Sequence, residues 1–148
     1  MTAIPANFGQ HHGTPEDREA IERLLTSYTQ SVTSNDKPRF ESLLLHPDIP
    51  FSSTRVLPKP DEANKSVETR NYASFKAVIF DSGEQFEQQF HNIAIEQMGD
   101  LAQVSLDYAT KDVATGHVGY GWKVLHLLRV RGEWKIASEF YTAYPTSE

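Results

Sequence analysis

The first half of the chain carries apolar residues at helical spacing in three segments. The longest segment begins at Thr14 and Pro15, a capping residue and a residue suited to a first helical turn. The apolar positions that follow form one stripe, made of Ile21, Leu24, Leu25, Tyr28 and Val32. Two shorter helices are expected, one that ends before Pro47 and one over residues 71–80, because their apolar residues also share one side.

The second half alternates apolar and polar residues, which is typical of strands. Residues 101–111 place Val104, Leu106 and Tyr108 on one face. Residues 84–97 also alternate, but the apolar parity changes partway, and a β-bulge near His91 and Asn92 would reconcile the two halves by bending the strand. A short strand is expected within residues 51–56, followed by an exposed polar loop to residue 70.

Residues 118–144 predict a hairpin of two long strands that turns at Gly132. A two-residue turn would pair Val130 with Glu133 and would mix large apolar and charged side chains on one face. A three-residue loop would pair Arg129 with Glu133 and would separate the two kinds of side chain. We prefer the second register, with the glycine in the left-handed position that such a loop needs.

The preferred register gives the hairpin one apolar face, which we predict to be the core. It consists of Tyr120, Trp122, Val124, His126 and Leu128 opposite Thr142, Phe140, Ser138, Ile136 and Trp134. The other face is amphipathic and too apolar for a freely solvated surface, so it predicts a surface that a partner covers. That surface consists of Lys123, Leu125, Leu127, Glu139 and Tyr141.

This order of elements predicts one α+β domain over residues 14–148, preceded by a flexible arm over residues 1–13. Three N-terminal helices would pack on one face of a strongly bent, four-stranded antiparallel meander. A bent sheet wrapped on helices can hold a pocket between the two layers. The length of 148 residues suffices for a full core in a single domain.

The composition excludes several classes of partner and chemistry but does not identify the function. The net charge of −6 argues against a nucleic-acid or anionic-membrane partner, because both favour a basic surface. The absence of cysteine excludes disulfides and thiolate chemistry. We expect no membrane span and a cytoplasmic location, because no apolar segment is long enough and the N-terminus lacks the apolar core of a signal peptide. No cofactor and no metal site are expected, since the histidines lack the spacing of a ligand set.

Several segments together resemble the nuclear transport factor 2-like superfamily, which includes SnoaL-like polyketide cyclases, scytalone dehydratase and ketosteroid isomerase. The resemblance lies in DREAIERLLTSYTQSVTSND, LLLHPDIPF, FHNIAIEQMGDLAQVSLDY and LHLLRVRGEWKIASEFYT, which touch most of the chain after residue 14. It implies a cystatin-like cone in which a curved sheet surrounds a deep apolar cavity. It also implies a homodimer formed through the sheet.

The catalytic pattern of the superfamily transfers in part. Tyr28 matches the first-helix tyrosine that serves the steroid isomerases as an oxyanion donor. The positions of their two acidic residues fall near Ser53 or Thr54 and near Trp122, none of which is acidic. The strand histidine of dehydratases and cyclases falls near residues 89–91, a range that includes His91.

The candidate catalytic residues are therefore His126, His91 and Tyr28. A neutral imidazole at position 126 could act as a base, and the alternative is a structural histidine bonded to Ser138 or Tyr28. The expected ligand-binding residues line an aromatic cavity: Tyr28, Tyr72, Phe75, Tyr108, Trp122, His126 and Phe140.

Three functions are compatible with these features. The preferred one is binding of a small apolar or aromatic molecule, which suits a cavity with few polar groups. The second is a cofactor-free dehydratase, cyclase or isomerase that uses a cavity histidine as its general base. The third is a dimeric protein-interaction module without a working pocket.

Overall fold

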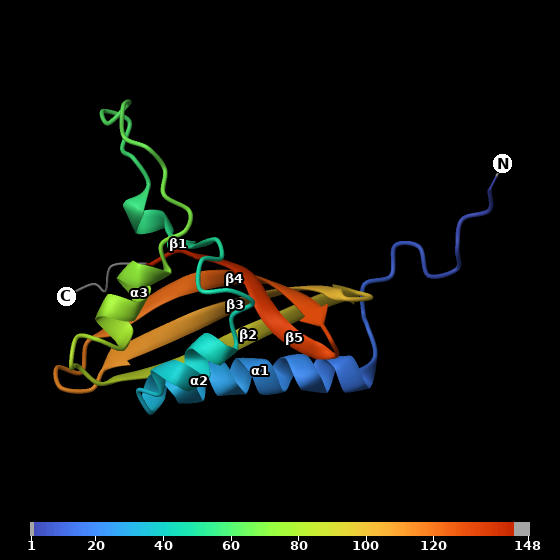
Figure 1. Cartoon of the computed structure of the whole chain (residues 1–148), viewed down its shortest axis with the longest axis horizontal. Coiled ribbons are helices and arrows are strands. Elements are labelled where there is room, and N and C mark those ends of the chain that lie inside the picture. Colours follow the sequence, from blue (N-terminus) through green and yellow to red (C-terminus); the bar gives the residue numbers. More distant parts are fainter. Residues whose placement is uncertain (1, 144–148) are drawn as a thin grey trace.

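The structure is a computed structural model that describes residues 2–143. One five-stranded sheet has the strand order β1-β5-β4-β3-β2. The elements in chain order are α1 (Pro15–Thr33), α2 (Lys37–Ser42), β1 (Phe51–Ser53), the 3-10 helix η1 (Thr54–Val56), α3 (Tyr72–Ile79), β2 (Phe86–Met98), β3 (Leu101–Asp112), β4 (Val118–Val130) and β5 (Glu133–Tyr141). Helix α1 runs along one face of the sheet, and α3 lies toward the end opposite the N-terminal arm (Figure 1).

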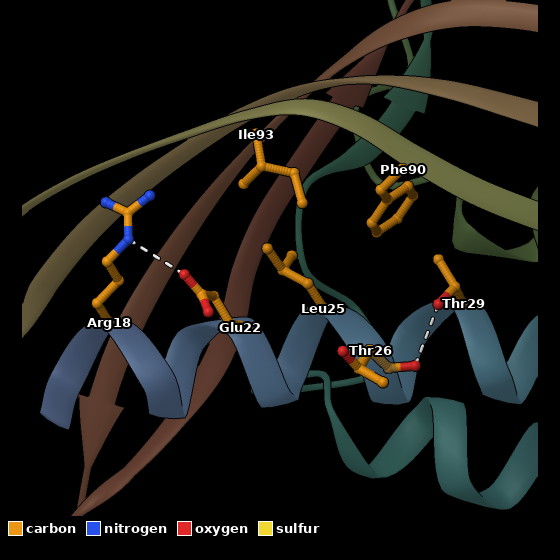
Figure 2. Close-up of a pocket in the computed structure, with 7 residues that line it drawn as sticks. All are labelled: Arg18, Glu22, Leu25, Thr26, Thr29, Phe90 and Ile93. Atoms are coloured by element: carbon orange, nitrogen blue, oxygen red, sulfur yellow. Dashed lines mark hydrogen bonds and ion pairs between the residues drawn. The ribbon is translucent and has the colours of Figure 1, made fainter. Parts of the chain in front are cut away.

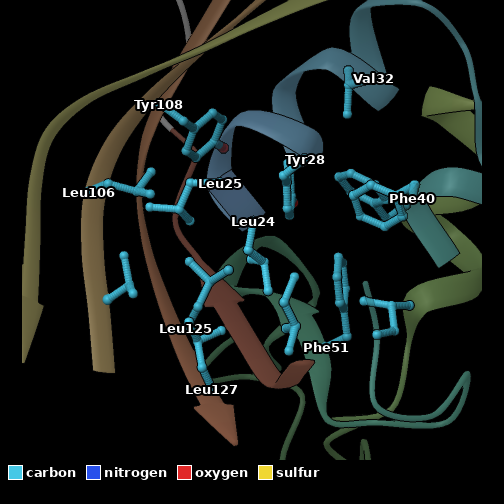
Figure 3. Packing of buried hydrophobic residues seen from close by; sticks show 14 of the residues in the cluster. Leu24, Leu25, Tyr28, Val32, Phe40, Phe51, Leu106, Tyr108, Leu125 and Leu127 are labelled. Carbon is cyan, nitrogen blue, oxygen red and sulfur yellow. The ribbon is translucent and has the colours of Figure 1, made fainter. Parts of the chain in front are cut away.

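Helix α1 forms where the stripe and the cap predicted it. The Thr14 hydroxyl accepts a hydrogen bond of 3.1 Å from the Asp17 amide, and Pro15 occupies the first turn. Ile21, Leu25 and Tyr28 are buried against the sheet. Figure 3 shows Leu24, Leu25, Tyr28, Phe40, Phe51, Leu106, Tyr108, Leu125 and Leu127 packed in a core between the helices and the strands.

The predicted α+β architecture, with three helices on a bent meander, is confirmed. Strands β2 to β5 pair antiparallel in sequence order, as expected. The short β1 adds a fifth strand, and it pairs parallel to β5, which makes the sheet mixed. The bulge in β2 is also confirmed, since the register shifts between His91 and Ala94 and Asn92 has a φ of 52°.

The preferred register of the β4–β5 hairpin is wrong. Val130 pairs with Glu133, so the turn has two residues, and both have positive φ, 52° at Arg131 and 80° at Gly132. A second register shift follows between His126 and Leu127, where the facing strand carries one extra residue at position 137. This bulge reverses the parity of β5 partway, a possibility that a single register for the whole hairpin excludes.

The two-residue turn exchanges the predicted faces of β4, and the bulge exchanges those of β5 beyond position 137. Lys123 and Glu139 are 1% and 0% exposed and face the helices, whereas Trp122 and Phe140 are 48% and 40% exposed on the outer face. The surface predicted for a partner therefore lies in or against the core: Lys123, Leu125, Leu127, Glu139 and Tyr141. The core face predicted for β4 is instead the outer one. On β5, Trp134 and Ile136 are buried as expected, because they precede the bulge.

The two glycines of β4 give a matched test of this packing. A Cβ at position 121 would lie 2.1 Å from the Thr142 carbonyl oxygen and 2.6 Å from the Tyr108 ring, whereas a Cβ at position 119 would lie 4.0 Å from its nearest neighbour. We expect Gly121→Ala to lower the free energy of unfolding by about 1–3 kcal/mol, since the backbone must shift. Gly119→Ala should be neutral or stabilise by about 0.5–1 kcal/mol. Urea denaturation of both variants checks this, and equal losses would contradict the packing.

Candidate functional site

A lysine, a glutamate and a tyrosine meet inside the core, and we call them the Lys123 group (Lys123, Glu139 and Tyr28). The Lys123 ammonium donates to the Tyr28 hydroxyl at 2.8 Å and to Glu139 Oε2 at 3.0 Å. The Tyr28 hydroxyl donates to the same carboxylate oxygen at 3.0 Å. Within residues 2–143, Glu139 Oε1 has no hydrogen-bond partner. The carboxylate thus keeps unused bonding capacity in a buried place.

Aromatic rings surround the ammonium on its other sides. Its nitrogen lies 4.6 Å from the ring centre of Tyr141, 4.8 Å from that of Tyr108, 5.0 Å from that of Tyr28 and 5.5 Å from that of Phe75. A cation is attracted to the face of an aromatic ring, and the attraction grows when water is excluded. The rings therefore stabilise the charge while keeping water away from it.

Burial changes the acidity of every member of the Lys123 group. Loss of solvation lowers the pKa of the Lys123 ammonium and raises the pKa of the Glu139 carboxyl, while their mutual attraction opposes both shifts. Burial also raises the pKa of Tyr28 well above its ordinary value. At the neighbouring Tyr108, burial and the Glu139 charge raise the pKa to about 12. Strongly shifted pKa values cluster at binding and catalytic sites.

A pocket of about 480 Å³ opens beside this group, between α3 and the inner face of the sheet, and we call it the α3 pocket. The end of the pocket that meets the Lys123 group is lined by Lys123, Tyr108, Tyr141 and Phe75. Other lining residues come from α3 (Val78 and Ile79) and from β2 and β3 (Phe86, Gln88 and Thr110). Polar residues at the pocket include Arg55, Glu84, Asp112 and His117.

The sequence of β4 explains why space remains there. Inner positions of this strand alternate as Gly119, Gly121, Lys123 and Leu125, so two consecutive inner positions carry no side chain. Tyr108 fills the space over Gly121 and donates from its hydroxyl to the Thr142 carbonyl oxygen at 2.7 Å. The space over Gly119 stays open and forms part of the pocket.

A second hollow of about 310 Å³ lies between α1 and the bulged part of β2 (Figure 2). Helix α1 contributes Arg18, Glu22, Leu25, Thr26 and Thr29, and β2 contributes Phe90 and Ile93. Its charged members are half exposed and pair with each other at 3.1 Å. This hollow is smaller and holds no buried charge, so we regard the α3 pocket as the better candidate site.

The seven residues expected to line one cavity are divided by the sheet. Phe75 and Tyr108 line the α3 pocket, and Tyr28 lies behind it in the Lys123 group. Tyr72 is buried in the aromatic core, with its ring stacked 5.9 Å from that of Phe40. The remaining three lie on the outer face, contrary to the predicted cavity: Trp122, His126 and Phe140.

The two candidate catalytic histidines are exposed on the outer face of the sheet. His126 Nδ1 lies 2.8 Å from the Ser138 hydroxyl, the bond expected of a structural histidine, and Nε2 lies 3.3 Å from Gln103 Oε1. His91 is exposed on β2 beside Asp107 on the neighbouring strand. The structure therefore separates both histidines from the α3 pocket.

The sequence interpretation missed Lys123 and Glu139 as members of a site. It placed both residues on the face of the hairpin away from the core, because charged side chains are rarely buried. The sequence did contain one signal. Lys123 shares a strand face with Leu125 and Leu127, and both leucines are fully buried.

Across residues 2–143, no cluster of three or more histidine, aspartate or glutamate side chains has a geometry that could hold a metal ion. Among the helices of the same range, none is both long and apolar enough to cross a bilayer.

Solved structures resemble this one in fold. No protein-family model and no curated protein matches the sequence. An NTF2-like protein of unknown function from Pseudomonas putida KT2440 has a TM-score of 0.69 at 14% identity, covering 91% of this chain and 92% of its own. A protein of unknown function with a cystatin-like fold from Nostoc punctiforme PCC 73102 has a TM-score of 0.66 at 12% identity, with coverage of 90% and 95%.

A proposed dehydratase of the NTF2-like family from Streptomyces avermitilis has a TM-score of 0.67 at 17% identity and covers 90% of this chain and 100% of its own. The chain has the cystatin-like fold of the nuclear transport factor 2-like proteins, as the resemblance in sequence implied. At these identities the likeness concerns the fold and not the reaction.

The buried ion pair predicts an unusual dependence of stability on pH. We expect Lys123→Met to lower the free energy of unfolding by about 3–5 kcal/mol near neutral pH, because it leaves a buried carboxylate without its partner. In the folded state of this variant, the pKa of the Glu139 carboxyl lies above its ordinary value of 4.5, because burial raises it and Lys123 no longer lowers it. In the unfolded state the pKa is ordinary. Above pH 4.5 the unfolded state then binds fewer protons than the folded state, so the stability falls as the pH rises through the raised pKa of folded Glu139.

The control is the double variant Lys123→Met with Glu139→Gln, whose amide cannot ionise and still accepts from the Tyr28 hydroxyl. It should regain at least about 2 kcal/mol and lose the dependence on pH. Denaturant titrations at several pH values measure both effects. A single variant that is as stable as the wild type at about pH 8 would show that the pair is not buried as described.

Proposed function

We propose that this protein binds a small, flat and mostly apolar molecule in the α3 pocket, with one polar group of the ligand directed at Lys123. The observation that carries the proposal is a lysine side chain that is 1% exposed and yet lines the pocket. The volume of about 480 Å³ lies in the range of small-molecule sites. Aromatic walls with one convergent charge suit a planar ligand that carries an oxygen atom or a negative charge.

A cofactor-free acid–base enzyme is the second candidate. The observation that favours it is the chain of short contacts from Lys123 through Tyr28 to Glu139, which could pass a proton. His126 and His91, the bases expected from the sequence, lie on the other side of the sheet. In this reading the Lys123 group replaces them as the proton-transfer group.

Binding can be measured with the fluorescent probe anilinonaphthalene sulfonate, which combines flat apolar rings with an anionic group. We expect one site per chain in the wild type. Gly119→Leu should weaken binding by about tenfold or more, because its side chain would occupy the open space over β4, and a loss of about 1.4 kcal/mol corresponds to that factor.

The matched control is Gln89→Leu, which adds the same side chain on the outer face of β2. It should bind the probe as the wild type does. Equal affinity in all three proteins would contradict binding in the α3 pocket, and absence of binding in the wild type would favour the interaction module without a working pocket.

We also propose a homodimer, but through the outer face of the sheet. Large apolar side chains are exposed on that face: Leu101, Tyr120, Trp122 and Phe140. Exposed apolar groups gathered on one side often mark a protein interface. The proposal keeps the predicted kind of partner and replaces the predicted surface, since Lys123 and Glu139 are buried under the helices.

Trp122→Glu should convert the dimer into a monomer, because it places a charge at the centre of the proposed apolar interface. Light scattering coupled to size-exclusion chromatography gives the mass directly. Phe8→Glu is the control, since Phe8 is 70% exposed in the N-terminal arm and the same change there should leave the mass unchanged. A wild-type protein that is monomeric at all concentrations would rule out the dimer.

A further inference from the structure

The two sides of the Lys123 amine differ in chemistry. On one side lie the rings of Tyr108, Tyr141 and Phe75, which line the α3 pocket. On the other side lie Tyr28 and Glu139, both fully buried and outside the pocket lining. An apolar pocket in front and a proton acceptor behind is the arrangement that activates an amine as a nucleophile.

We propose that Lys123 forms a reversible imine with the carbonyl group of an aldehyde or ketone bound in the α3 pocket. This inference rests on the ligand-binding function proposed above and specifies its ligand class. A lysine in a desolvated apolar site gives up its proton more readily than one in water and then attacks carbonyl carbon. The other lysines of the described chain are at least partly exposed to solvent, so they lack this environment.

The reaction balances without an oxidant or reductant. Glu139 Oε2, 3.0 Å from the nitrogen, accepts one proton from the ammonium. The free electron pair on nitrogen then forms a bond to the carbonyl carbon, and the carbonyl oxygen becomes a hydroxyl by taking that proton. A second proton passes from nitrogen to Glu139 and leaves with the hydroxyl as water while the carbon–nitrogen double bond forms. The products are a protonated imine, water and the original carboxylate.

The size and shape of the pocket restrict the carbonyl compound. The walls on the way to Lys123 are aromatic, and Gly119 leaves the space in front of them open. A planar aldehyde attached to fused rings therefore fits better than a branched aliphatic one. Naphthaldehyde serves as the probe, and naphthalene methanol, which has the same rings but no carbonyl group, is its matched control.

Trapping with cyanoborohydride tests the imine directly, because the reductant adds hydride to an imine and fixes the ligand on nitrogen. We expect naphthaldehyde to label Lys123 of the wild-type protein at least about tenfold more than any other lysine, as measured by peptide mass spectrometry. Naphthalene methanol should give no adduct. Labelling spread evenly over the exposed lysines would overturn the proposal, and this measurement on the wild type does not depend on a variant that folds.

Variants then separate the roles within the group. Lys123→Arg keeps the positive charge but should lose the adduct, whereas Lys135→Arg should keep it. Glu139→Gln should slow labelling by about 100-fold, the effect of losing a positioned base, while Glu133→Gln on the same strand should not. Retained labelling in Lys123→Arg, or an unchanged rate in Glu139→Gln, would contradict the assignment.

Displacement of anilinonaphthalene sulfonate distinguishes this inference from the proposed function. If naphthaldehyde and naphthalene methanol both displace the dye and neither is trapped on Lys123, the pocket binds planar ligands and the imine is refuted. If neither compound displaces a dye whose affinity falls in Gly119→Leu, and no adduct forms, the imine is refuted and the binding function stands, whereas a wild-type protein that binds neither the dye nor the two compounds refutes both. Displacement by both, with an adduct from the aldehyde alone, supports both proposals.

Discussion

The burial of one ion pair governs both the packing and the chemistry of this protein. Transferring Lys123 and Glu139 out of water costs several kcal/mol for each ion, and their attraction offsets that cost only with good geometry and further hydrogen bonds. The Tyr28 hydroxyl supplies two such bonds, and four aromatic rings, that of Tyr28 among them, supply the rest of the environment. Helix α1, strand β4 and strand β5 must therefore keep their positions for the charges to be tolerated. Apolar residues at these positions would hold the same elements together at no greater cost, so stability alone does not account for the pair.

The bulge in β5 determines which side chains reach this group. The extra residue at position 137 lets Trp134 and Ile136 face the helices before the bulge and Glu139 and Tyr141 face them after it. Without the bulge, the second pair would point outward and the carboxylate could not meet the lysine. Strand β1 holds the backbone of Glu139 in place. Phe51 pairs with Glu139, and the Glu139 amide donates to the Pro50 carbonyl oxygen at 2.9 Å. A local irregularity of the backbone thus fixes a long-range contact.

The sequence predicted those features that repeat along a single segment. The stripe of α1, the alternation in β3 and the change of parity in β2 each appear in one run of residues, and the structure confirms them. The prediction of the hairpin register failed because the bulge leaves no local trace in the sequence. Position 137 is an alanine, which is equally acceptable on either face of the strand. The prediction that Lys123 and Glu139 lie outside the core failed for another reason. Lys123 is stabilised by Tyr28, 95 positions away, and neither residue's neighbours reveal that contact. An assumption that charges lie outside therefore selected the wrong face.

The two glycines of β4 differ in whether packing requires them. Glycine in a strand weakens it, since the chain loses more conformational freedom and buries no side chain. At Gly121 packing gives a sufficient reason, because the Tyr108 ring and a carbonyl oxygen occupy the place of a Cβ. At Gly119 no neighbour forbids a side chain, and a larger residue would bury apolar surface in the hollow. A pocket that could be filled at little steric cost, and that ends at a desolvated amine, has the form of a site kept open for a ligand.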